Sequence, residues 1–89
     1  MIMLEPEPEP LRFWSGRGLR DFVGKHNISI ADLAIRAGLR PSTVAKIMSS
    51  RIEPSLSTAA LIYRECRLDD PTVSFSELFF DSPGLWRDL

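Results

Sequence analysis

The chain has 89 residues, 44% of them hydrophobic, which suffices for one small domain with a single core. No apolar run approaches the roughly 18–20 residues of a membrane span, and no basic-then-apolar leader opens the chain, so we expect a soluble, cytoplasmic protein. The one cysteine, Cys66, has no partner for an internal disulfide and no metal-ligand spacing around it. The sequence therefore supports neither a disulfide-stapled secreted fold nor a zinc site, and Cys66 is expected to be a small buried residue.

A formal net charge of -1 conceals a separation of charge along the chain. Between Arg12 and Arg51 there are eight basic and two acidic residues. The first eleven residues carry three glutamates and no basic side chain, and the residues after Arg51 carry seven acidic and three basic ones. A chain polarised in this way can present a cationic face to a polyanion while it stays acidic elsewhere, the alternative being a well-mixed solvated surface.

Residues 1–11, MIMLEPEPEPL, alternate glutamate with proline, which removes backbone donors and disfavours helix. We expect a flexible, disordered tail here. Ser15 is expected to cap a first helix that runs to about Lys25, and Phe13 and Trp14 to pack over that helix as an anchor. The inward face of the helix is predicted to carry Leu19, Phe22 and Val23.

A second short helix is predicted from about Ile30 to Ala37, because Ser29 stands three residues before Asp32 in a capping-box-like pair. Gly38 is expected to end this helix in the left-handed conformation. A third helix is predicted to begin at Pro41, a favoured first-turn residue, and to run to about residue 49. Its apolar stripe is predicted to consist of Val44, Ile47 and Met48.

Two further helices are predicted, one from about Ser55 to Arg67 and one that begins at a capping box of Ser74 and Glu77. No run alternates with a period of two for long enough to suggest a sheet, so the fold class is all-α. We place the domain at residues 12–80 and a C-terminal extension at 81–89. The inward face of the fourth helix is predicted to carry Leu56, Ala59, Ala60, Tyr63 and Cys66.

Two short helices joined by a tight turn at Gly38 and Leu39 make the helix-turn-helix pattern, whose second helix lies in the DNA major groove. Ala34 is small enough to let the two helices cross closely. Apolar contacts that hold them at a fixed angle are expected from Leu33, Leu39, Val44 and Ile47. The outward face of the third helix is then Pro41, Ser42, Ala45, Lys46 and Ser49.

With these elements in place, the sequence resembles the Cro/C1-type (XRE-like, lambda-repressor-like) helix-turn-helix proteins of phage repressors and bacterial regulators. The resemblance spans about residues 19–80 and rests on four segments in the same order: LRDFVGKHNIS, DLAIRAGLRPSTVAKIMSS, PSLSTAALIYREC and VSFSELF. It implies a compact five-helix lambda-repressor-like domain. It also implies a DNA-binding transcription regulator.

In that family the outward residues of the third helix read base edges, and the helix ends and nearby loops grip phosphates. Ser42 and Lys46 are the best base-edge candidates, because both can donate to groove acceptors such as guanine O6 and N7. Ala45 is placed to pack against a thymine methyl, and Pro41 begins the same face. The residues placed to contact phosphate or sugar are Arg36, Arg40, Thr43, Ser49 and Arg51.

The sequence departs from the family at two positions. Family members often carry glutamine at the positions that correspond to Ile30 and Pro41, and neither residue present here can hydrogen-bond DNA through its side chain. Direct base readout should therefore be sparse, with more of the specificity left to DNA shape. Loss of DNA binding is the alternative.

The C-terminal segment FFDSPGLWRDL carries more apolar surface than a domain this small can easily hide. Because family members commonly pair as twofold dimers, we expect a homodimer on a pseudo-palindromic operator of double-stranded DNA. The alternative is that Trp86 folds back on its own chain. The expected dimer contacts are Phe79, Phe80, Leu85, Trp86 and Leu89.

The resulting interpretation is a sequence-specific regulator, a small homodimeric repressor or switch protein at a promoter operator of a phage, a mobile element or an autoregulated bacterial locus. The alternative is an antitoxin-type or antagonist protein that uses the same domain and the C-terminal aromatic residues to bind a protein partner. No catalytic constellation is visible, His26 being a lone histidine, so we expect no enzyme, no cofactor and no metal.

Overall fold

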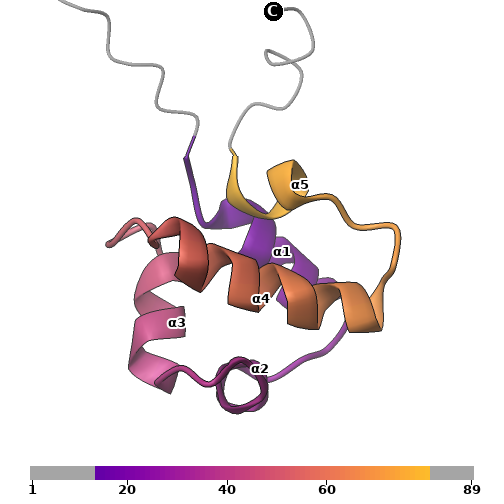
Figure 1. Cartoon of the computed structure of the whole chain (residues 1–89), viewed down its shortest axis with the longest axis horizontal. Coiled ribbons are helices and arrows are strands. Elements are labelled where there is room, and N and C mark those ends of the chain that lie inside the picture. Colours follow the sequence, from indigo (N-terminus) through magenta and orange to yellow (C-terminus); the bar gives the residue numbers. More distant parts are fainter. Residues whose placement is uncertain (1–13, 81–89) are drawn as a thin grey trace, which may run out of the picture.

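Five helices follow one another along residues 14–80, the part of the chain that the computed structural model describes (Figure 1). Among these residues there is no strand, only an isolated antiparallel bridge between Trp14 and Phe80. The predicted tail, Phe13, and the residues Leu85, Trp86 and Leu89 lie outside the described range. The helices are α1 (Arg17–Lys25), α2 (Ile30–Ala37), α3 (Pro41–Met48), α4 (Leu56–Asp69) and α5 (Phe75–Phe79).

The start of α1 differs from its prediction, because Gly16 and not Ser15 is the N-cap. Ser15 is held in extended pairing with the end of α5, where its N–H donates to the backbone oxygen of Phe79 at 2.9 Å. Gly16 in turn lies against the last turn of α3, and a Cβ at this position would overlap the backbone oxygen of Ile47. The Ser15 hydroxyl nevertheless accepts from the Arg17 N–H at 3.1 Å, so it binds the first helical N–H of α1 from one position before the N-cap.

The α2–α3 unit has the predicted form. The Ser29 hydroxyl accepts a hydrogen bond from the Asp32 N–H at 2.9 Å and caps α2. Gly38 ends α2 with a φ of 77°, and the Leu39 N–H then donates to the Ala34 oxygen at 2.8 Å. Because the turn closes in this short space, α3 begins only three residues later, with Pro41 in its first turn.

The buried face of α4 differs from the prediction. Ala59 and Cys66 are buried as expected, but Leu56 is 76% exposed and Ala60 is exposed. The buried stripe of α4 includes Ile62 and Glu65, so the helix is rotated about its axis relative to the prediction. Tyr63 is only half-buried. Glu65 can be buried on this face because the Arg36 guanidinium of α2 lies 3.3 Å from its carboxylate.

The capping box predicted for α5 is confirmed. The Ser74 hydroxyl accepts from the Glu77 N–H at 3.2 Å, and the Glu77 carboxylate accepts from the Ser74 N–H at 2.7 Å. This short helix packs on α1 and contributes Leu78 and Phe79, each 1% exposed, to the core. Phe79 is therefore buried within its own chain and could meet a partner only as part of a pocket wall, not as the exposed dimer contact that was expected.

A single core joins all five helices. Its fully enclosed members include Leu19 of α1, Leu33 of α2, Val44 and Ile47 of α3, and Ile62 of α4. No helix in the described part of the chain has the length and apolar content to cross a membrane.

Candidate DNA-binding surface

Close packing on its inner side fixes the orientation of α3. Ala34 and Leu33 on α2 and Val44 and Ile47 on α3 are all 0% exposed, and Leu39 in the turn is half-buried against the same cluster. In Figure 1, α3 stands at one end of the bundle, with α2 at its foot and α4 running away from it. Side chains on the outer side of α3 are thus held on a rigid support.

The outer side of α3 carries the residues that the sequence predicted to face outward. They are all exposed, and they make one continuous surface opposite the buried stripe. Only lysine among them brings a charge, so the surface offers one flexible cation, small hydroxyls and short apolar groups. The exposed set is Pro41, Ser42, Ala45, Lys46 and Ser49.

Two arginines stand at the two ends of this helix. Arg40 is its N-cap residue, and Arg51 follows its C-terminal end, where the Arg51 N–H donates to the Lys46 oxygen at 2.8 Å. Both side chains are exposed. The eight residues of α3 span about 12 Å, so one cationic residue lies just before the outward surface and one just after it.

The hydroxyl candidates for phosphate contact differ in their availability. Thr43 is half-buried on the flank of α3. Ser49 is exposed, but its hydroxyl donates to the Lys46 oxygen at 3.2 Å, and its N–H donates to the Ala45 oxygen. A phosphate oxygen needs a donor, so Ser49 would have to release an intrahelical bond to provide one.

Arg36, predicted to contact phosphate, serves the fold instead. Its guanidinium lies 3.3 Å from a Glu65 carboxylate oxygen and 3.0 Å from an Asp69 carboxylate oxygen, both on α4. Hydrogen bonding to Asp69 is the main cause that raises the pKa of Arg36 above its ordinary value. This charge is already neutralised within the bundle, which argues against the assignment of Arg36 as a phosphate contact.

Ile30 has a structural role that accounts for its departure from the family pattern. The residue begins α2 and packs, half-buried, against the core. Pro41, the other departure, is exposed at the first turn of α3. The side chains of Ile30 and Pro41 therefore offer no hydrogen-bond donor to DNA.

Two residues that shape this surface were missed in the sequence analysis. Ser50 adopts a φ of 63° just after α3, and its hydroxyl accepts from the Gly16 N–H at 2.9 Å, which ties the end of α3 to the start of α1. Glu65, 7% exposed, is the buried anion that holds Arg36. The position of Glu65 next to Cys66, within the apolar stripe of α4, was a weak sign in the sequence that Glu65 is buried. Nothing in the sequence around Ser50 indicates its contact with Gly16.

The α2–α3 unit lies within a segment of the chain that matches a known protein family. A helix-turn-helix family model matches residues 19–69, which run from α1 through α4 and leave α5 outside the match. Neither curated proteins nor solved structures give a significant match to the chain. Because the family match covers more than half of the 89 residues, the chain belongs to the Cro/C1-type, XRE-like helix-turn-helix family, which comprises DNA-binding transcription regulators.

Proposed function

We propose that this protein is a sequence-specific regulator that binds double-stranded DNA as a homodimer and acts as a repressor or switch at a promoter operator. The observation that carries the proposal is the outward surface of α3, exposed over Ser42, Ala45 and Lys46, rigidly backed by the core and flanked by Arg40 and Arg51. Phage, mobile-element and autoregulated bacterial loci suit a regulator of this kind.

Each exposed side chain of α3 has a distinct role in this proposal. Lys46 donates to guanine O6 or N7, Ser42 donates to a base edge, and Ala45 packs on a thymine methyl. Pro41 makes only van der Waals contact. Such a surface provides few two-pronged contacts, so sequence-dependent groove width and bendability supply the rest of the specificity.

Phosphate contacts set the register of the protein on the duplex. Arg40 and Arg51 are the principal ones, with Thr43 and Ser49 as minor donors. A twofold dimer would place two α3 helices about 34–36 Å apart, one turn of DNA, and the operator would be pseudo-palindromic. Phe80 is retained as a dimer contact, together with Leu85, Trp86 and Leu89 of the C-terminal extension.

The test is binding to the DNA upstream of the protein's own gene, compared with random duplex at two salt concentrations by fluorescence anisotropy. We expect a selective complex whose affinity falls steeply with salt, because cations on the protein release counterions from DNA. Equal affinity for both duplexes, or none for either, would exclude operator recognition.

A protein-binding antagonist or antitoxin is the second candidate function. It is favoured by Ile30 and Pro41, whose side chains have no hydrogen-bond donor for DNA. In that case the protein would show no salt-sensitive DNA affinity and would co-purify with a stable protein partner.

A further inference from the structure

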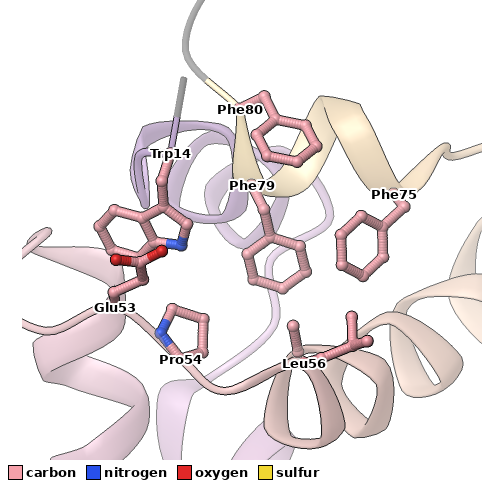
Figure 2. Close-up of a pocket in the computed structure, with 8 residues that line it drawn as sticks. Trp14, Glu53, Pro54, Leu56, Phe75, Phe79 and Phe80 are labelled. Atoms are coloured by element: carbon pink, nitrogen blue, oxygen red, sulfur yellow. The ribbon is translucent and has the colours of Figure 1, made fainter. Parts of the chain in front are cut away.

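An apolar groove lies between the entry to α4 and the end of α5 (Figure 2). Its volume is about 210 Å³, and Phe79 forms part of its wall beside the half-buried rings of Phe75 and Phe80. Trp14 and Pro54 line the opposite side. A hollow of this size accommodates one large apolar side chain, so it is suited to receive a single protruding residue.

A protruding residue of this kind stands on the rim of the same groove. Leu56, the first residue of α4, lines the groove and yet is 76% exposed. Ile52, four residues earlier, is 39% exposed. One short segment therefore exposes two large aliphatic side chains to water, and one of them, Leu56, lies at the edge of the groove.

Opposite charges accompany this apolar pair. Arg51 and Glu53 flank Ile52, both are exposed, and within residues 14–80 neither forms an ion pair. Glu53 also lines the groove. The face thus carries both a protruding side chain, Leu56, and a groove, and both a cation and an anion. Contact across a twofold axis requires a surface that is complementary to itself in this way.

We propose that this face is where a second copy of the chain docks, with each Leu56 seated in the groove of the other copy and each Glu53 beside the other copy's Arg51. The proposal rests on the dimeric function proposed above, and it places the main contact of the dimer at this groove and not in the C-terminal extension. Arg51 can still reach DNA, because a guanidinium has five N–H donors and one carboxylate engages only some of them.

The position of the groove connects it to the recognition surface. Trp14 lines the groove, the next residue donates its N–H to Phe79 at 2.9 Å, and Gly16 donates to the Ser50 hydroxyl at the end of α3. Three consecutive residues thus link the docking face to α3. A second copy seated in the groove would hold its own α3 at a fixed distance and angle from the first.

Sedimentation equilibrium of the full chain without DNA tests the proposal, with Leu56→Glu as the variant and Leu68→Glu as its control. Leu68 lies on the same helix and is 71% exposed, so the two substitutions match in chemistry and in exposure. We expect a reversible wild-type dimer, a dissociation constant raised at least about tenfold by Leu56→Glu, and little change with Leu68→Glu. Melting curves should show both variants folded, since neither leucine is in the core.

Charge exchange provides a second, independent variant. Glu53→Arg should weaken the dimer by placing like charges together, and adding Arg51→Glu to the same chain should restore it. A wild type that stays monomeric, equal effects of Leu56→Glu and Leu68→Glu, or a dimer lost on removal of residues 81–89 but kept in Leu56→Glu would overturn the proposal. Binding of the Leu56→Glu monomer to a half-site of DNA distinguishes a wrong interface from a wrong function. That binding needs α3 but not the dimer, so it should persist if the protein is a DNA-binding regulator.

Discussion

Arg36 on α2 donates a hydrogen bond of 3.0 Å from Nη2 to the backbone oxygen of Glu65 on α4, while its Nε lies 3.3 Å from the carboxylate of the same residue. One guanidinium thus satisfies both a buried side chain and a carbonyl of the helix that faces it. The α2–α4 contact positions the helix-turn-helix unit on the bundle.

Arg36→Ala is expected to destabilise the protein by about 1–3 kcal/mol, because it leaves the Glu65 carboxylate buried with only the exposed Arg64 nearby. Arg20→Ala, which removes an exposed arginine of α1, is the control and should change stability little. Urea unfolding measures both. Unchanged stability with weakened DNA binding would instead make Arg36 a phosphate contact.

Lys46→Ala is expected to lower affinity for the operator by about 1–3 kcal/mol while leaving affinity for random DNA nearly unchanged, because it removes a base contact. Arg40→Ala should weaken both complexes alike and reduce the salt slope by about 1. We choose Arg40 for this comparison because Arg51 also belongs to the proposed dimer face. DNA titrations of both variants at several salt concentrations measure these affinities. Identical behaviour of the two variants would contradict the assignment of Lys46 to a base and Arg40 to a phosphate.

Gly18 and Gly24 lie in the same helix but differ in their surroundings. A Cβ at Gly18 would overlap the backbone oxygen of Glu77 on α5, whereas a Cβ at Gly24 would meet nothing within 4 Å. We expect Gly24→Ala to stabilise the protein by about 0.5–1 kcal/mol and Gly18→Ala to destabilise it by about 1–3 kcal/mol. Denaturant midpoints of the two variants test this, and equal shifts would mean that α1 and α5 are not in close backbone contact.

Burial raises the pKa of the Cys66 thiol from 9.0 to about 12, with a smaller contribution from the Asp69 charge. The thiolate is the reactive form, so iodoacetamide at pH 8 should modify the native protein very slowly and the unfolded protein readily. The folded pKa is the higher one, so the thiol's stabilising contribution is complete below pH 9 and is lost as the pH rises from 9 towards 12. Rapid labelling of the native protein would show that α4 opens locally.

The Thr72 hydroxyl donates to the Asp70 carboxylate at 2.7 Å, and the Thr72 N–H donates to it at 3.0 Å. These two bonds, the hydroxyl's first, lower the pKa of Asp70 from its ordinary value of 3.8. Because the folded pKa is the lower one, this carboxylate stabilises the protein above about pH 3.8 and ceases to do so as the pH falls below that value. Asp70→Asn should therefore flatten the acid limb of a stability profile. Asp21→Asn, at an exposed site on α1, is the control. If both variants flattened the acid limb to the same extent, the loss of stability at low pH could not be assigned to Asp70.

Local signals predicted much of this protein because they act within a few residues. Ser29 with Asp32 and Ser74 with Glu77 are capping pairs three residues apart, and Gly38 closes its turn with its immediate neighbours. The outward face of α3 follows from the 3.6-residue period once Val44 and Ile47 are inward. The sequence by itself therefore determined the helices, the helix-turn-helix unit and the candidate DNA-reading residues.

Tertiary structure alone decided the features that depend on partners far away in the chain. The N-cap of α1 lies at Gly16 while the Ser15 N–H pairs with Phe79, and Arg36 contacts Glu65 at a separation of 29 residues. The rotation of α4 that buries Glu65 also leaves Leu56 exposed beside the groove. No periodicity within a single helix carries this information, because which face is buried, and which charge is already neutralised, depends on what the neighbouring helices present to it.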